Sequence, residues 1–332
     1  MPHAPPHDHS MLWEMRPASA EEFAMAREQR EWHAPTQRLA AAAAVALMGG
    51  WLAGIGPAGA APLVYESFAY DADTQLDETP ATGQNLTGDY AALGTLPQQV
   101  LVVTSPGLDY GSLVGAPTAS GNAIVDADPG TAAGATVSVD QDVVVGSGGA
   151  IYWSALFTFD DSLNANHLAS ITLRDDATGD QLVFGEPVVG SGAIRVEANT
   201  GATGGLVSDG ADNSFIDGHT LLLIGRYLDS PALDGDILQL IGYDTADAVV
   251  LPSSFDPTDP NLEFAYELAG LDIDFAQITS ISFTIRGANN NFIDELRIGS
   301  TWADVIPEPA TASLLALGLV AMGVGARAGR RG

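Results

Sequence analysis

Apolar and polar residues alternate along most of the chain between residues 61 and 305, a pattern typical of β-strands that bury one face. Nine segments carry this alternation or a β-rich apolar run: residues 63–70, 99–105, 135–145, 150–159, 169–175, 220–228, 236–243, 278–287 and 291–299. Turn formers separate them, including the run Asp175–Asp180 and the triplet Asp234–Asp236. Many short strands without a long helical period predict one antiparallel β-sandwich over residues 61–305.

The segment 150–159, AIYWSALFTF, shows the alternation most clearly. Because successive strand residues point to opposite faces, its side chains divide into two sets. The first set is Trp153, Ala155, Phe157 and Phe159, and the second is Tyr152, Ser154 and Thr158. We expect the aromatic set to pack into the core rather than to form a carbohydrate platform, since large apolar side chains supply much of the core area.

An apolar run near the start of the chain has a different character. Residues 39–48, LAAAAAVALM, follow Arg38, and a small-residue site, Ala58–Gly59–Ala60, comes after them. A basic residue, a short apolar run and an A-x-A site in this order predict a signal peptide, residues 38–60, cleaved by signal peptidase after Ala60. The alternative is a buried alanine-rich helix of a globular domain.

A second apolar run, Ala310–Ala326, has 17 residues without a charge. As a helix it would be about 26 Å long at 1.5 Å per residue, the lower limit for crossing the hydrocarbon core of a membrane. Arg327, Arg330 and Arg331 follow directly, and a basic cluster in this place is retained on the cytoplasmic side. The sequence therefore predicts a C-terminal transmembrane helix with a stop-transfer basic tip.

Pro307, Glu308 and Pro309, the apolar run and the basic tip together resemble the PEP-CTERM sorting signal of exported Gram-negative proteins. The resemblance covers residues 306–332 and implies that an exosortase, a membrane-embedded cysteine transpeptidase, processes the tail. Both prolines suit a recognition segment because they keep the chain extended and lack backbone donors. The alternative is a plain tail anchor in which the tripeptide occurs by chance.

The acidic charge is concentrated in the middle of the chain. The 42 acidic residues face 12 basic ones, all arginine, for a formal net charge of -30, and residues 61–306 hold 35 of the acids and 5 of the arginines. Such a field repels nucleic acid, which excludes DNA or RNA binding. We interpret it as a solvated surface, with a dedicated cation-binding role as the alternative. Repulsion should also raise many carboxylate pKa values on folding.

The β-rich region resembles the laminin-G-like or concanavalin-A-like jelly rolls carried by many PEP-CTERM proteins. The resemblance rests on an opening YESFAY, a central YWSALFTF, the strand HTLLLIGRY before DGDILQLIGY, and a closing NFIDELRIGSTWADV. It spans residues 63–305 and implies a two-sheet β-sandwich. Domains of this shape include both glycan-binding modules and glycoside hydrolases, so the resemblance alone leaves the activity open.

Motifs that would indicate catalysis are missing from the sequence. The chain has no cysteine, no G-x-S-x-G elbow and no Glu-x-Asp-x-Glu or Glu-x-Asp-x-x-Glu pair as in retaining glycosidases. Asp294 and Glu295 are adjacent, so we expect their side chains on opposite faces, whereas Glu295 and Arg297 should share a face as an ion pair. His167 and His219 are interpreted as ordinary loop or strand-edge residues.

Calcium is the one cofactor that the sequence leaves open. Asp71, Asp73 and Asp77 lie in one predicted loop, and Asp256, Asp259 and Glu263 lie in another. Oxygen-rich clusters suit a hard cation with six to eight ligands, although neither stretch matches an EF-hand loop. The alternative is that these carboxylates are solvated loop acids.

The predicted organisation has four parts: an N-terminal extension, the signal peptide, the β-sandwich and the sorting signal, at residues 1–37, 38–60, 61–305 and 306–332. The extension is either disordered, or translation begins at an internal methionine such as Met25. We expect a non-catalytic protein of the surface or extracellular matrix, in the inner membrane only transiently, with polysaccharide or envelope components as partners. The alternative is a secreted carbohydrate-active enzyme.

Overall fold

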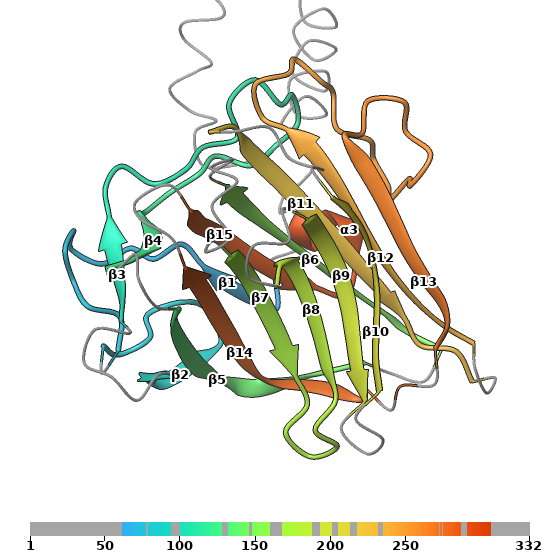
Figure 1. Ribbon diagram of the computed structural model, residues 1–332, viewed down its shortest axis with the longest axis horizontal. Helices are drawn as coiled ribbons and strands as arrows, with labels where there is room; N and C mark the ends of the chain where they lie inside the picture. The colour runs from blue at the N-terminus through green and yellow to red at the C-terminus, as the bar shows by residue number, and fades with distance from the viewer. Residues whose placement is uncertain are drawn as a thin grey trace, which may run out of the picture. The chain divides into compact units, whose positions relative to one another are not determined.

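The structure is a computed structural model. It describes residues 62–77, 79–93, 100–127, 132–145, 148–159, 168–187, 193–200, 205–212, 218–231, 235–271, 273, 275–286 and 291–306. These residues form two antiparallel β-sheets that pack face to face and one short helix, α3 (Trp302–Val305) (Figure 1). The expected all-β antiparallel sandwich is confirmed.

One sheet has eight strands and the other has seven. The eight-stranded sheet has the order β13 (Phe264–Leu271), β12 (Asp236–Asp244), β11 (Thr220–Leu228), β6 (Ala150–Thr158), β15 (Phe292–Gly299), β4 (Ala123–Asp126) and β3 (Leu101–Thr104), and β1 (Val64–Glu66) also pairs with β15. The seven-stranded sheet has the order β10 (Gly205–Asp212), β9 (Ala193–Thr200), β8 (Gln181–Glu186), β7 (Leu168–Arg174), β14 (Gln277–Arg286), β5 (Ala133–Val144) and β2 (Leu86–Ala92).

All nine segments with the expected strand pattern contain a strand. The sequence analysis missed six others: β2, β4, β8, β9, β10 and β13. The strand β13 carries a detectable signal, because Phe264, Tyr266 and Leu268 are buried and alternate with exposed residues. The predicted turn Asp175–Asp180 joins the paired strands β7 and β8, as expected of a hairpin connection.

The main core fills the space between the two sheets. The expected inward set of β6 is confirmed, because Trp153, Ala155, Phe157 and Phe159 all have 0% exposure. The ring of Trp153 lies 5.5 Å from that of Phe184 in the opposite sheet, centroid to centroid. Burying a side chain of this size contributes about 1.5–3 kcal/mol, so these contacts account for much of the attraction between the sheets.

A second apolar cluster lies on the outer face of the eight-stranded sheet. Leu156, Leu222 and Ile241 of the sheet pack against side chains from the segment after β12, from the segment between β3 and β4, and from α3. Trp302 Nε1 donates to the carbonyl of Pro252 at 3.0 Å, and Ser154 Oγ donates to that of Val305 at 3.1 Å. The chain therefore covers much of this sheet face itself.

Several predicted features fall outside the described residues. These are the N-terminal extension, the signal helix with Ala58 and Ala60, the sorting tripeptide Pro307–Pro309, the transmembrane helix and the basic tip. Within the described ranges between residues 62 and 306, no helix is long and apolar enough to span a membrane.

The contact between Gly225 and Trp153 provides a test of the core. The two residues pair across β6 and β11, and a Cβ atom at Gly225 would overlap the indole ring. Since Trp153 is fully buried, the ring has little room to move, and we expect Gly225→Ala to lower the free energy of unfolding by about 1–3 kcal/mol in urea titrations. The exposed Ser138→Ala should change it by less than about 0.5 kcal/mol. Equal stabilities for the two variants would contradict this packing.

Candidate functional site

A β-bulge in β15 brings charged side chains together on the outer face of the eight-stranded sheet. The register with β6 shifts between Asp294 and Arg297, and Glu295 has a φ of 55°. Asp294 pairs with Leu156, whose side chain lies in the outer cluster, and Glu295 contacts Arg297 on the same face. The expected placement of Asp294 and Glu295 on opposite faces is therefore wrong, because the bulge interrupts the alternation.

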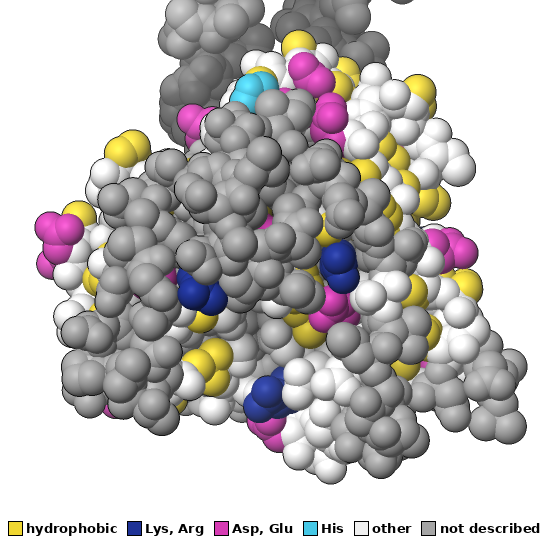
Figure 2. Space-filling model, in the orientation of Figure 1, with side chains coloured by type: hydrophobic (Ala, Val, Ile, Leu, Met, Phe, Trp, Pro, Cys, Tyr) yellow, Lys and Arg dark blue, Asp and Glu magenta, His cyan; other side chains and the backbone are white. Residues whose placement is uncertain are grey.

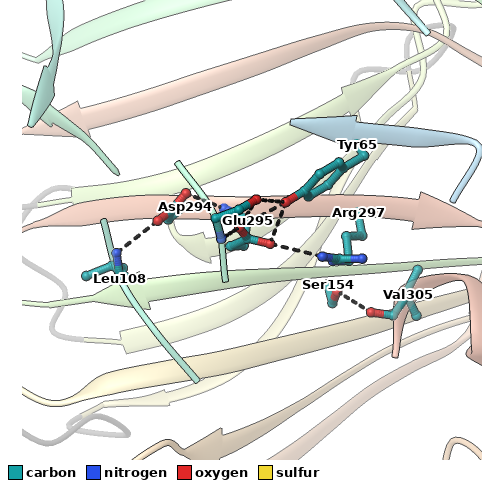
Figure 3. A network of polar contacts seen from close by, with 8 residues as sticks. Tyr65, Leu108, Ser154, Asp294, Glu295, Arg297 and Val305 are labelled. Carbon is teal, nitrogen blue, oxygen red and sulfur yellow. Dashed lines mark hydrogen bonds and ion pairs between the residues drawn. The ribbon is translucent and has the colours of Figure 1, made fainter. Parts of the chain in front are cut away.

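The segment between β3 and β4, residues 105–122, covers these carboxylates. Asp294 accepts hydrogen bonds from the backbone N–H of Leu108 at 2.9 Å and from that of Glu295 at 2.7 Å (Figure 3). Glu295 accepts one from the backbone N–H of Ser120 at 2.5 Å. Both carboxylates thus hold the same segment, at points twelve residues apart.

Glu295 also belongs to a charged cluster with Tyr65 and Arg297. The Tyr65 hydroxyl lies 3.0 Å from each carboxylate oxygen, and Arg297 Nη2 lies 3.1 Å from Oε2 (Figure 3). The Arg297 guanidinium also stacks 4.4 Å above the Tyr65 ring. The predicted ion pair between Glu295 and Arg297 is confirmed. It is almost fully enclosed, because Glu295 has 0% exposure and Arg297 has 8%.

Burial changes the protonation of Asp294. Loss of hydration and then the nearby Glu295 charge raise the pKa of Asp294 to about 9, although the two backbone N–H groups lower it. Burial lowers the pKa of Arg297, but Tyr110, Glu295 and Tyr65 together raise it above its ordinary value. At neutral pH the site therefore contains a protonated Asp294 and, next to it, the ion pair of Glu295 with Arg297.

A second buried acid, Glu66, lies on β1, next to the bulged strand. It accepts hydrogen bonds from the backbone N–H of Phe68 at 2.7 Å and from the Tyr90 hydroxyl at 2.5 Å. Burial raises the pKa of Glu66 despite these donors. Tyr70 also points its hydroxyl at Glu66, at 3.4 Å. The sequence analysis missed this group, because its members are spread over 24 residues without a motif.

The geometry of Asp294 and Glu295 bears on the enzyme alternative. A retaining glycosidase directs two carboxylates about 5 Å apart at a bound sugar. Here Asp294 has 1% exposure and Glu295 has 0%, and backbone or side-chain donors bind both groups. The pair binds the covering segment, and in this conformation it is closed off from solvent.

Neither predicted calcium loop has a cluster of acidic groups among the residues that the structure describes. No three His, Cys, Asp or Glu groups converge on one point in the described part of the chain, which includes Asp71, Asp73 and Asp77. In the second loop, Asp256 accepts from Thr258 N–H at 2.9 Å, and Asp259 accepts from Asn261 N–H at 2.9 Å. These oxygens stabilise their own turns, which is why the acids do not gather around a cation.

His167 is outside the described residues, whereas His219 lies in the loop directly before β11, as expected of a loop or strand-edge residue. Its Nδ1 is 2.5 Å from Oδ2 of Asp244. Burial and the charges of Asp244 and Asp247 raise the pKa of the neighbouring Glu263, and His219 lowers it. The charges that shift the pKa of Glu263 are thus those of Asp244, Asp247 and His219, not those of Asp256 or Asp259.

A polar ladder crosses three strands of the eight-stranded sheet. Arg226 of β11 donates to Gln239 of β12 at 2.5 Å, and Gln239 donates to Glu267 of β13 at 2.6 Å. The Arg226 guanidinium lies 4.4 Å above the ring of Phe255. Only strand pairing brings these residues together, so no local sequence signal could have identified them.

The predicted rise in carboxylate pKa values occurs at four described acids, but with a different main cause. Burial is the largest contribution for Glu66, Glu197, Glu263 and Asp294. Charge repulsion adds to it at Glu263 and Asp294. The exposed Asp256 shows the opposite shift, because hydrogen bonds from Thr258 lower its pKa.

Asp294 should make stability depend on pH. The native carboxyl keeps its proton up to about pH 9, whereas the unfolded one loses it near about pH 3.9. The native state therefore binds more protons in this window, and the free energy of unfolding should fall as pH rises through it. We expect Asp294→Ala to make this fall shallower in urea titrations at about pH 5, 7 and 9.

Asp256→Ala serves as the control, because an exposed acid with a lowered pKa titrates below this window. Folding also raises the pKa values of Glu66, Glu197 and Glu263. The free energy of unfolding of the Asp294→Ala variant should therefore still fall as pH rises, but less steeply. An unchanged slope in Asp294→Ala would contradict a protonated native Asp294.

The comparisons with known proteins found similar solved structures and one matching family model. The solved structures similar to the chain include lectin II from Ulex europaeus, at 9% identity over 70% of this chain and 99% of that one, with a TM-score of 0.38. They also include the VIP36 exoplasmic/lumenal domain in its Ca²⁺/Man3GlcNAc-bound form, at 12% identity over 70% of this chain and 90% of that one, with a TM-score of 0.35.

A legume lectin-like domain from Entamoeba histolytica has 9% identity over 54% of this chain and 84% of that one, with a TM-score of 0.34. These TM-scores are low, and the sandwich architecture rests on the chain's own two sheets. No curated protein matches the chain in sequence. One family model does match, and it identifies residues 305–331 as a PEP-CTERM protein-sorting motif.

Proposed function

We propose that the chain is an exported, exosortase-processed, non-catalytic protein of the cell surface or extracellular matrix of a Gram-negative bacterium, and that its β-sandwich binds polysaccharide. The observation that carries the proposal is the sorting motif, which begins at Val305, the last residue of α3. A sorting signal placed directly after a folded domain supports export of that domain.

The proposed order of events follows the order of the segments. Signal peptidase removes residues 38–60 together with the extension 1–37, and the apolar helix holds the chain in the inner membrane with Arg327, Arg330 and Arg331 on the cytoplasmic side. An exosortase then acts at the tripeptide and releases residues 61–305 from this anchor. In this proposal the domain is a legume-lectin-like or concanavalin-A-like jelly roll.

Two features of the described residues support a binding role over catalysis. The closely spaced carboxylates of Asp294 and Glu295 are enclosed, and α3 and two loop segments cover much of the outer face of the eight-stranded sheet. The other sheet presents polar side chains outward, such as Ser138, Thr172 and Thr284. Polar side chains on an outer sheet face suit contact with a polysaccharide more than cleavage within a groove.

Replacing Pro307, Glu308 and Pro309 by alanine tests the sorting step. We expect the variant to be exported but to stay in the inner membrane at its unprocessed mass, since the signal peptide acts first and the tail second. Cell fractionation with mass spectrometry provides the measurement, and a variant with alanine at Thr311, Ser313 and Leu314 serves as the control. If the tripeptide variant reaches the surface at processed size, the exosortase recognises a segment other than Pro307–Pro309.

A combined screen tests the binding role. We expect the full-length chain, purified in mild detergent, to bind at least one class of polysaccharide on a glycan array and to release no reducing sugar from any of them. If the chain releases reducing sugar, and replacing one of its carboxylate residues abolishes this release, the carbohydrate-active enzyme would be favoured. Binding to no polysaccharide on the array would count against the binding role.

A further inference from the structure

The sorting motif overlaps the folded domain at its first two residues. The family model begins at Val305, and the described part of the chain ends at Ile306. Both residues are buried, with 0% and 2% exposure, in the apolar cluster on the outer face of the eight-stranded sheet. The residues that lead directly into Pro307–Pro309 are therefore part of the packed domain.

The C-terminal turn, residues 300–306, holds these two residues through their backbone as well as their side chains. Val305 is the last residue of α3, so its backbone is helical. Its carbonyl accepts a hydrogen bond from Ser154 Oγ at 3.1 Å, and the N–H of Ile306 donates to the carbonyl of Trp302 at 2.8 Å. These backbone groups already have partners inside the domain.

Trp302 joins the C-terminal turn to the segment after β12. Its indole N–H donates to the carbonyl of Pro252 at 3.0 Å, and its ring lies 6.0 Å from the ring of Phe255 in an edge-to-face arrangement. Asp304 accepts a hydrogen bond from the N–H of Thr301 at 2.7 Å, which caps the start of α3. Opening the turn would expose its apolar side chains to water, so the packed state is favoured.

Little chain separates the C-terminal turn from the predicted membrane helix. Pro307, Glu308 and Pro309 are the residues between Ile306 and the apolar run that begins at Ala310. Even fully extended, this stretch reaches at most about 14 Å. In the proposed anchored state, an enzyme that acts at the tripeptide therefore works directly beside the folded domain.

The packed turn conflicts with the way in which enzymes bind peptide substrates. Recognition of a peptide commonly requires an extended stretch whose backbone groups can pair with the enzyme. Val305 is helical, and the carbonyl of Val305 and the N–H of Ile306 are bonded within the domain. A folded segment is cut from its transiently opened form, at a rate that follows the population of that form.

We propose that the C-terminal turn regulates the sorting step: its packing hides the N-terminal side of the motif, and the exosortase acts on chains in which this turn has opened. This inference rests on the proposed function and adds regulation to it. Opening of the turn breaks the contacts of Trp302, Val305 and Ile306 but leaves the strand pairing of both sheets in place. The time that the domain spends in the inner membrane is then set by this local opening.

A duplicated segment tests the proposal directly. A second copy of residues 303–306, inserted after Ile306, places the same side chains before the tripeptide but outside the C-terminal turn. We expect the full-length variant to be processed at least about fivefold faster than the unmodified chain, because the enzyme no longer waits for the turn to open. Pulse-chase labelling of the producing cells, with mass spectrometry of both forms, gives the rate. Processing at the unmodified rate or more slowly would overturn the inference.

Trp302→Ala weakens the C-terminal turn without lengthening the chain. We expect faster processing, and no further gain when this change is combined with the duplicated segment. The control for a general loss of stability is Ile171→Val, at a fully buried position of the seven-stranded sheet, the layer toward the viewer in Figure 2. If Ile171→Val accelerates processing as much as Trp302→Ala, relative to the melting temperature that each variant loses, processing follows unfolding of the whole domain and the inference is wrong.

A measurement on the purified full-length chain, in mild detergent, separates this inference from the proposed function. A proline-specific endopeptidase is added, and mass spectrometry follows the cut after Pro307, with the same order of rates expected among the variants. If all variants are cut at one rate, the C-terminal turn does not shield the motif and the inference fails while the sorting step stands. If they are cut in the expected order but no form is processed in cells, the sorting step of the proposed function fails, and with it the regulatory role of the turn.

Discussion

The hydrogen bonds from the β3–β4 segment to Asp294 and Glu295 determine how the outer face of the eight-stranded sheet is used. Without them, a segment of eighteen residues, 105–122, would have fewer contacts to the sheet beneath it. Both carboxyl groups are buried, so the two backbone donors form their hydrogen bonds in a region of low dielectric, and the bond from Ser120 to the ion-paired Glu295 is charge-assisted. Tyr110 and Leu113 of the segment then complete the apolar cluster around Trp302.

This arrangement has an electrostatic cost that the domain offsets in different ways. Glu295 has a partner in Arg297 and donors from Tyr65 and Ser120, whereas the pKa of Asp294 is raised to about 9. Glu66 relies on tyrosine hydroxyls and a backbone N–H. A buried charge without a partner costs several kcal/mol, so protonation of one acid lets two carboxyl groups occupy the same small volume.

The sequence allowed prediction of the fold class and of most central strands, because alternation in segments such as 150–159 and 278–287 directly reflects a buried face. It was less informative at short or weakly alternating strands such as β4 and β10. The bulge could not be predicted, since a positive φ at Glu295 depends on tertiary contacts rather than on residue type. The Glu295–Arg297 ion pair could be predicted because residues two apart in a strand usually lie close together on the same face.

The position of Ile306 shows on which side of the domain the described chain ends. This last described residue is 2% exposed and packs with Trp302 and Val305 on the outer side of the eight-stranded sheet. The sorting motif continues from this point, so a tether made through it leaves the domain on that side. The seven-stranded sheet forms the opposite layer of the sandwich. A domain held in this way would have its seven-stranded layer on the side away from its attachment point.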